Sequence, residues 1–436
     1  MLVPPAALDS LELYPWHAGA GTETAASPFT LNLNTTCKLT GYGAANPPDR
    51  QLYPQRSEAL LFTRLRFMLT ARWRDQANVD VAYEQAGQFS SFDRNGAAGG
   101  SDAGAGLGVG GAGASGGGAT GAGGDLAFRV TPLTDTLIDR PRFVYIHDLD
   151  RLLFAWHPNW GEVTVGRQAI GLGRGVLFGA LDLFAPFSPL AVDREWRPGV
   201  DAVRVERHLT DSSSIEAIAV GGTDWAQSAG LVRMRGYLGP ADAEIMAGVR
   251  AQDLFAGADA SSAIGDAELH GEFALFRTLQ PHPDGEPFGD PRLVPKFLFG
   301  GSYTFNSIGA GLTVVAEYFY SGFGAPHADQ ILPLLADPDY AVRFARGDSQ
   351  ILGRHAFGVQ ATYPFATAWT GSCNLVVSPV DGSGALAPIL RWDATDTASW
   401  TLSATLPWGR PARGPALRSE YGATPASLFL QAAWYL

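Results

Sequence analysis

The sequence predicts an all-β protein: a transmembrane antiparallel β-barrel of about eighteen strands, with sixteen as the alternative count. Apolar and polar residues alternate along many short segments, and the links between these segments are mostly short and long in turn. No apolar run approaches the ~18 residues that a membrane-spanning helix requires. Because successive side chains of a strand point to opposite faces, each alternating segment has one apolar and one polar face.

The first strands show this alternation most clearly. In "FTLNLNTTCKLTGY" and "LFTRLRFMLTARWR", apolar residues take every second position over most of the length, and Thr, Asn, Lys or Arg stand between them. The predicted strands are 29–42, 59–74, 77–88, 142–156, 160–170, 200–208, 213–222, 229–238, 241–252, 255–264, 266–277, 295–305, 310–321, 353–364, 367–378, 384–393, 397–408 and 426–436.

Connection lengths predict the orientation of the barrel. Tight turns such as 74–77, 157–160 and 238–241 alternate with mostly longer links. These links are 43–58, 89–141, 171–199, 278–294, 322–352 and 409–425. Outer-membrane barrels have short periplasmic turns and long extracellular loops. With eighteen strands both termini lie on the short-turn side, and this parity requires a strand boundary near residue 253.

A soluble β-sandwich also buries one face of each strand, so alternation alone does not exclude it. Charged residues in the middle of the polar faces favour the barrel, and so does the absence of a blade-length repeat. Aromatic residues near strand ends suggest an interfacial girdle. These residues are Trp73, Tyr83, Tyr363, Trp369, Trp392, Trp400, Trp408 and Trp434.

Composition narrows the functional class. Charged residues make up 17% of the 436 residues, and the mean hydropathy is +0.01. A formal net charge of −12 argues against a nucleic-acid partner bound through a broad basic face. Cys37 and Cys373 lie far apart and belong to no Cys-x-x-Cys or haem-attachment motif, so we expect no cofactor on them.

The N-terminus has no basic stretch followed by an apolar one, so no signal peptide is recognisable. Since the strands favour export, we expect the chain shown to be mature or trimmed. Residues 1–28 are then a periplasmic segment, and residues 29–436 form a single barrel domain.

Two loops have a distinctive composition. Residues 99–124 are mostly glycine and alanine, which bury no core, so they are predicted to be the flexible tip of a glycine-rich extracellular loop, 89–141. The segment 328–347 is typical of a short helix pair interrupted by Pro338. We expect this pair to pack against the base of its own loop, with capping of the mouth as the alternative.

Three stretches together resemble a family of porin-like outer-membrane barrels from Gram-negative bacteria: residues 161–203, 352–365 and 374–409. Their motif residues are Gly166, Arg167, Gln168, Gly173, Gly175, Asp182, Leu183, Phe184, Pro186, Asp193, Arg194, Arg197, Pro198 and Gly199. The chain departs from the family at Leu172 and Ala356, where Trp and Tyr are common. The resemblance covers about residues 140–436, and it implies fold and compartment rather than substrate.

The resemblance and the C-terminal sequence suggest the surroundings of the protein. A bacterial outer-membrane barrel has outer-membrane lipid and lipopolysaccharide as partners. The final segment "SLFLQAAWYL" resembles the signal by which the barrel-assembly machinery recognises such proteins, although it ends in Leu436 rather than Phe or Trp.

If the polar faces point inward, the lumen carries both signs of charge. Separated basic and acidic walls would create a transverse field that orients dipolar solutes. Inward ion pairs that only satisfy one another are the alternative, and both interpretations stay open. The pore-lining candidates are Arg64, Arg66, Arg72, Arg204, Glu206, Arg233, Arg235, Glu268, His270 and Glu272.

Loop 171–199 is the predicted constriction element. Its segment "LFGALDLFAPFSP" is too apolar for a free loop, so we expect it inside the barrel or over its mouth. Glycines 171, 173 and 175 let the chain leave the wall sharply. By strict alternation Arg167 faces lipid, unless a bulge at Gly166 turns it inward. The constriction candidates are Arg174, Asp182, Phe184, Phe187, Asp193, Arg194 and Arg197.

The sequence does not predict an enzyme. It has no Gly-x-Ser-x-Gly motif, and no Walker lysine follows the glycines. His270 between Glu268 and Glu272 could hold a divalent ion, but a solvated stripe in the lumen is the favoured interpretation, so we expect no metal. The predicted function is a porin-like channel for passive passage of small hydrophilic solutes or ions. The alternative is a structural barrel that sheaths or docks a periplasmic partner, such as a multihaem cytochrome or a polysaccharide-export assembly.

Overall fold

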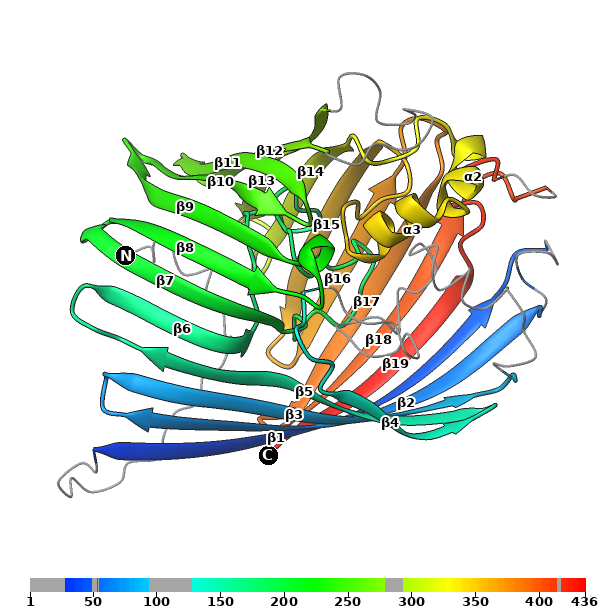
Figure 1. Ribbon diagram of the computed structural model, residues 1–436. Helices are drawn as coiled ribbons and strands as arrows, with labels where there is room; N and C mark the ends of the chain where they lie inside the picture. Colours follow the sequence, from blue (N-terminus) through cyan, green and yellow to red (C-terminus); the bar gives the residue numbers. More distant parts are fainter. Residues whose placement is uncertain (1–27, 49–52, 54, 94–127, 279–292, 414–416) are drawn as a thin grey trace.

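The computed structural model describes residues 28–48, 53, 55–93, 128–278, 293–413 and 417–436, and these residues form a β-barrel (Figure 1). Eighteen strands make the wall. They are β1 (Phe29–Ala45), β2 (Ser57–Trp73), β3 (Ala77–Ser90), β5 (Phe143–Trp156), β6 (Gly161–Gln168), β7 (Val200–Thr210), β8 (Ser213–Gly221), β9 (Ala229–Leu238), β10 (Ala241–Arg250), β11 (Asp253–Ile264), β12 (Ala267–Arg277), β13 (Leu293–Phe305), β14 (Leu312–Ser321), β15 (His355–Ala366), β16 (Trp369–Val377), β17 (Gly384–Thr395), β18 (Ala398–Trp408) and β19 (Ala426–Tyr435).

The wall is closed and antiparallel throughout. Consecutive wall strands pair with each other, and β1 also pairs with β19 from Thr36 opposite Tyr435 to Ala45 opposite Ala426. The expected boundary near residue 253 is a two-residue turn, in which Ala251 and Gln252 have φ values of 49° and 74°. Positive φ at both central positions matches the twist of a tight hairpin. The prediction of a closed barrel of about eighteen strands is confirmed.

Turns and loops separate the two ends of the barrel (Figure 1). We call the end that carries turns 74–76, 157–160 and 239–240 the short-turn rim, and the opposite end the long-loop rim. The predicted helix pair is confirmed at the long-loop rim, as α2 (Ile331–Leu335) and α3 (Pro338–Ala345). Ile331 packs with Ala325 and Leu352 of the same loop. None of the helices in the described ranges is long and apolar enough to cross a membrane.

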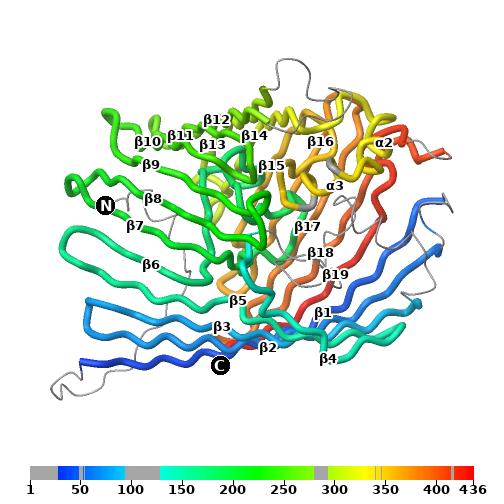
Figure 2. The backbone as a smooth tube through the Cα atoms, viewed as in Figure 1, coloured from blue at the N-terminus to red at the C-terminus, as the bar shows by residue number. Residues whose placement is uncertain are grey.

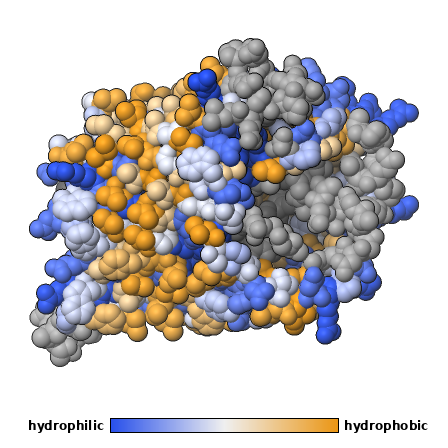
Figure 3. Space-filling view, in the orientation of Figure 1, coloured by the Kyte–Doolittle hydropathy of each residue, from blue (hydrophilic) through white to orange (hydrophobic). Residues whose placement is uncertain are grey.

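The outer surface of the barrel is apolar. Orange side chains form a broad band over the strands in Figure 3, with hydrophilic residues toward both ends. Phe154 and Phe299 are 48% and 62% exposed, which is unusual for large apolar side chains of a water-soluble protein. Trp73, Trp156 and Trp434 are exposed near the short-turn rim. The prediction placed Tyr83 near a strand end, but it lies mid-strand in β3, 3.2 Å from His147 Nδ1.

The long link 89–141 ends in a short strand that the sequence did not predict. Strand β6 has only eight residues, and the chain leaves the wall after Gln168. Beside the half of β5 nearer the long-loop rim, β4 (Thr134–Arg140) takes the place that a longer β6 would fill (Figure 2). Arg129 holds this segment through Asp148 and Asp150 at 3.0 and 3.3 Å. The glycine-rich residues 99–124 lie outside the described residues, as do residues 1–27.

An apolar core fills part of the lumen. Leu181, Leu183 and Phe178 of the loop after β6 are at most 2% exposed. They pack in one cluster with Phe276, Phe319 and other inward-facing residues of the wall. Burial of this apolar surface fixes the loop inside the barrel.

Candidate functional site

The loop between β6 and β7, residues 169–199, crosses the interior of the barrel, and we call it the lumen loop. Its residues 173–181 contact β10, β11, β12 and β14, whereas residues 193–197 contact β1, β2 and β19 on the opposite side. Gly173 has φ of 87°, a conformation that L side chains rarely adopt. A Cβ at Gly175 would lie 1.9 Å from the carbonyl oxygen of Phe178, so this turn requires glycine.

Two buried wall glutamates hold the first part of the lumen loop. Glu272 accepts the backbone N–H groups of Arg174, Gly175, Ala180 and Leu181. Glu317 accepts those of Val176, Leu177 and Phe178, at 2.6, 2.9 and 3.0 Å. Hydrogen bonds to an ionised acceptor are about twice as strong as neutral ones. The glycine-rich turn is therefore an anion cradle, and the anions it holds are carboxylates of the barrel wall.

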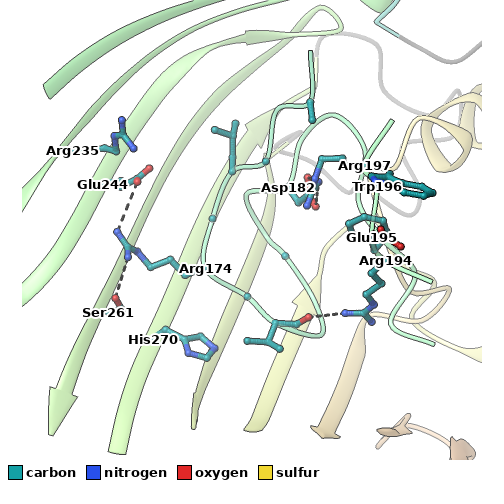
Figure 4. A pocket seen from close by; sticks show the side chains of 18 of the residues that line it. Arg174, Asp182, Arg194, Glu195, Trp196, Arg197, Arg235, Glu244, Ser261 and His270 are labelled. Atoms are coloured by element: carbon teal, nitrogen blue, oxygen red, sulfur yellow. Dashed lines mark hydrogen bonds and ion pairs between the residues drawn. The ribbon is translucent and has the colours of Figure 1, made fainter. Parts of the chain in front are cut away.

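Arg174 extends from this turn toward an acidic part of the wall (Figure 4). Its guanidinium lies 3.1 Å from Asp242, 3.8 Å from Glu244 and 2.5 Å from Asp259. These acids come from β10 and β11, and Ser261 accepts a further bond at 3.1 Å. Arg174 thus faces three carboxylates, of which Glu244 also pairs with Arg233 at 3.3 Å.

The second part of the lumen loop is fastened where the barrel closes. Lys38 of β1 lies 2.8 Å from Asp193 and 2.6 Å from Glu195. Gln431 and Tyr435 of β19 donate to the same two acids at 3.2 and 3.1 Å. Burial alone would raise the pKa of Asp193, but Lys38 and Arg64 outweigh it and hold this pKa below its usual value.

Trp196 lies between the second part of the loop and the wall. The Lys38 ammonium is 4.0 Å from the centre of its ring, and the Arg66 guanidinium is 4.9 Å away. Cations near an aromatic face interact favourably with the ring electrons. The indole thus adds to the ion pairs that hold residues 193–197 in place.

Arg194 differs from the other loop arginines because it has no ion pair within the described part of the chain. It donates instead to the carbonyl oxygens of Val176, Ser188 and Pro189, at 2.8, 3.0 and 2.7 Å. Burial lowers the pKa of Arg194 to about 10, so it stays charged at neutral pH. Arg194 therefore bridges the two parts of the loop and contributes a net positive charge.

A cavity of about 2640 Å³ borders the lumen loop and extends along the short-turn half of several strands. Side chains of both charge signs line it. The pore-lining candidates on its surface are Arg66, Glu206, Arg235, Glu268 and His270. The constriction candidates on its surface are Arg174, Asp182, Phe187, Asp193, Arg194 and Arg197, and Figure 4 shows several of them.

The remaining candidates do not line this cavity. Arg64 pairs with Glu84 at 2.9 Å, and Arg204 pairs with Glu216 at 2.6 Å. Arg233 is 4% exposed between Glu216 and Glu244. For these residues, mutual neutralisation describes the structure better than exposure to a pore. The other three are Arg72, exposed near the short-turn rim, Glu272, beneath the lumen loop, and Phe184, packed edge-to-face against Phe128 in the core.

Two orientations were considered for Arg167: facing lipid, or turned inward by a bulge at Gly166. Its register partner in β5 is Leu152, which is 45% exposed, so the sheet places Arg167 on the outer face. It is nevertheless 2% exposed, because it pairs with Asp201 at 2.7 Å and donates to the carbonyl oxygen of Thr131. The segment beside β4 covers it, and no inward turn is needed.

His270 is a hydrogen-bonded wall residue. Its Nδ1 lies 3.1 Å from Glu268, and its Nε2 lies 3.1 Å from Glu317. Glu272 is directed at the lumen loop instead. No group of three His, Cys, Asp or Glu side chains with metal-binding geometry occurs in the described ranges.

Comparison with solved structures finds chains of the same fold. OccAB1 of Acinetobacter baumannii superposes with a TM-score of 0.54 at 10% identity, over 93% of this chain and 96% of that chain. The fold is shared with OccAB1 and with two others. OccK9 (OpdG) of Pseudomonas aeruginosa gives 0.52 at 8% identity, over 93% and 98% of the two chains. OccAB3 of Acinetobacter baumannii gives 0.51 at 11% identity, over 93% and 99%.

At these identities the likeness concerns the fold alone. No family model matches the sequence, and no curated protein matches it. The likeness therefore says nothing about the role of the charged residues in the lumen.

Proposed function

We propose that the protein is an outer-membrane channel for passive passage of small hydrophilic solutes or ions, with the lumen loop as its constriction. One observation carries the proposal: a loop fastened to opposite walls crosses a closed barrel and borders a large cavity that is lined by charges of both signs. An eighteen-stranded barrel is wide enough for an aqueous channel.

The outer surface supports placement in a membrane. Barrels satisfy every backbone group between strands, which allows them to cross a bilayer. The exposed phenylalanine side chains and the tryptophans near the short-turn rim match a lipid-facing band with an interfacial girdle. The fold of the Acinetobacter and Pseudomonas porins agrees with the same placement.

A sheath around a periplasmic partner is less well supported. The lumen loop and its apolar core occupy part of the interior that an enclosed partner would need. We therefore take the channel as the proposed function and the sheath as an outcome of its test.

The test is electrical. Purified protein in planar lipid bilayers should give ohmic, ion-selective conductance steps, after heat-modifiable migration has shown that the barrel is folded. Folded protein that stays silent and copurifies with a periplasmic partner would favour the sheath. Protein that is neither membrane-extracted nor heat-modifiable would exclude both functions.

The constriction has its own test. Removal of residues 176–192 should enlarge the conductance, but it would also strip amide donors from buried Glu272 and Glu317. A point change in an anchor is therefore cleaner, and unchanged conductance in a folded anchor variant would reject the constriction.

A further inference from the structure

Three loops of the long-loop rim meet at Glu420: residues 322–354, 378–383 and 409–425. The Oε1 atom of Glu420 accepts the backbone N–H groups of Leu352 and Gly353, each at 3.0 Å. The N–H of Glu420 donates to Asp381 Oδ2 at 2.7 Å. Ser383 extends the junction, since its hydroxyl donates to Asp381 Oδ1 at 2.6 Å and accepts the N–H of Tyr421 at 3.1 Å.

The second carboxylate oxygen of Glu420 has no partner with hydrogen-bond geometry, although the Ser378 side chain lies close enough to the carboxylate to oppose the rise of its pKa. Glu420 is 3% exposed, and its Oε2 is buried without a hydrogen-bond partner in the part of the chain that the structure describes. A Cβ placed on Gly353 would lie 2.6 Å from this oxygen, so the main chain fills the space next to it. The gap does not suit a metal ion with its shell of ligands, whereas a proton fits on the oxygen itself.

The charges around Glu420 do not compensate it. Asp381 faces it from loop 378–383, Tyr421 follows it in its own loop, and Tyr340 of α3 is close enough for Glu420 to raise its pKa. Arg354 donates its Nε to the Gly324 carbonyl at 3.2 Å, and Arg418 is exposed. No lysine or arginine among the described residues forms an ion pair with Glu420. Two neighbouring carboxylates in a dry site cannot both ionise cheaply.

We propose that Glu420 binds one proton at this junction, and that this proton locks the three loops, so that the channel mouth is closed in acid and loosened in alkali. The electrical part of this inference rests on the proposed channel function, and the structural part does not. The loops carry α2, α3 and the apolar cluster of Ile331, Leu352 and Leu417, so their loosening would rearrange the long-loop rim.

The pKa of Glu420 determines how docking of the three loops changes with pH, and over which pH range. Burial raises this pKa to about 7; the amide of Gly353 opposes the shift, and Asp381 adds to it. A free glutamate titrates near ~4.3. The docked loops thus bind the proton more tightly than released loops. Docking is strongest below ~4.3, weakens as the pH rises and levels off above about 7.

Amide hydrogen exchange of the full-length protein tests the lock without assuming a channel. After correction for the intrinsic pH dependence of exchange, the peptide containing Leu352 and Gly353 should exchange at least about tenfold faster at pH 8.5 than at pH 5.5. Glu420→Gln mimics the protonated acid and should keep the slow rate at both pH values. Asp393→Asn, an exposed acid at the short-turn rim, is the matched control and should behave like the wild type.

The outcomes separate the two proposals. A Glu420→Gln variant that retains the wild-type pH dependence, or a wild type with equal corrected rates, overturns the lock. Should Glu420→Gln not fold, Asp381→Asn replaces it, and its transition should move to lower pH; an unmoved transition also overturns the lock. Wild-type conductance should rise between pH 5.5 and 8.5. If exchange follows the expected pattern while no conductance is seen, the lock stands and the channel fails.

Discussion

Glu272 of strand β12 accepts the backbone N–H of Ala180 at 2.6 Å, which ties the apolar tip of the lumen loop to the barrel wall. With Glu317 it receives seven amide bonds from residues 174–181. The position of the loop therefore depends on two carboxylates that lie between 91 and 141 residues away in the sequence. Changing one of them is the most direct way to move the loop.

Glu272→Gln should release the first part of the lumen loop. The new amide group would face N–H donors of Ala180 and Leu181, and unsatisfied buried donors cost about 1–3 kcal/mol each. We expect a larger and noisier single-channel conductance and a lower melting temperature of the folded barrel. Glu206→Gln is the control, because Glu206 pairs with Arg235 on the wall and makes no contact with the loop. Identical conductance in the two variants would show that Glu272 does not position a constriction.

Gly175→Ala should displace the same turn without a change of charge. Its Cβ would lie 1.9 Å from the Phe178 carbonyl oxygen, and that oxygen belongs to the main chain, which has to move. We expect the conductance change of Glu272→Gln to be reproduced. Gly239→Ala, at a short-rim turn with open space around it but a positive φ of 65°, tests the effect of backbone strain without a steric clash. An effect of equal size there would contradict a local role for Gly175.

The lumen-loop arginines on the cavity surface should affect ion selectivity more than an arginine that is paired away from the cavity. Arg174→Gln leaves Asp242 and Asp259 without the cation they share, while Glu244 keeps Arg233, and should raise the cation-to-anion permeability ratio about threefold, or ~0.7 kcal/mol. Arg194→Gln removes a charge that no carboxylate balances and should shift the ratio in the same direction. Arg204→Gln, paired off the cavity surface with Glu216, is the control. Reversal potentials in asymmetric salt measure all three, and equal shifts would exclude site-specific selectivity.

Much of the fold was predictable because the wall obeys a local rule. Alternation of side chains sets both strand position and facing, so the eighteen wall strands and the inward direction of Lys38 or Glu206 follow from the sequence alone. Strand β4 was not predicted because it depends on tertiary structure: β6 ends early, and β4 pairs with the part of β5 that β6 leaves unpaired. Its sequence "TDTLIDR" has too little alternation to reveal it.

The candidate site was predictable only in part. Which wall residues contact the lumen loop depends on the register of the strands and on the path of the loop. The apolar sequence 177–189 indicated a packed loop, but nothing local shows that Glu272 lies beneath it rather than beside water. Trp196 and Glu195 lie in the loop, where no periodicity assigns a direction. Lys38 was on a polar face, yet its role as an anchor appears only when β1 meets the loop.

Acid should weaken the anchor at the closure of the barrel. The pKa of Asp193 is held below its usual value, so the stability it contributes is present above ~3.9 and is lost as the pH falls through its own pKa. Lys38→Met should produce the same loosening at neutral pH, because Asp193 then lies buried without its cation. We expect increased current noise in the wild type below about pH 3.9 and in the variant at pH 7. Lys38→Arg keeps the charge and should restore quiet currents, and a Lys38→Met channel as quiet as the wild type at both pH values would refute the anchor.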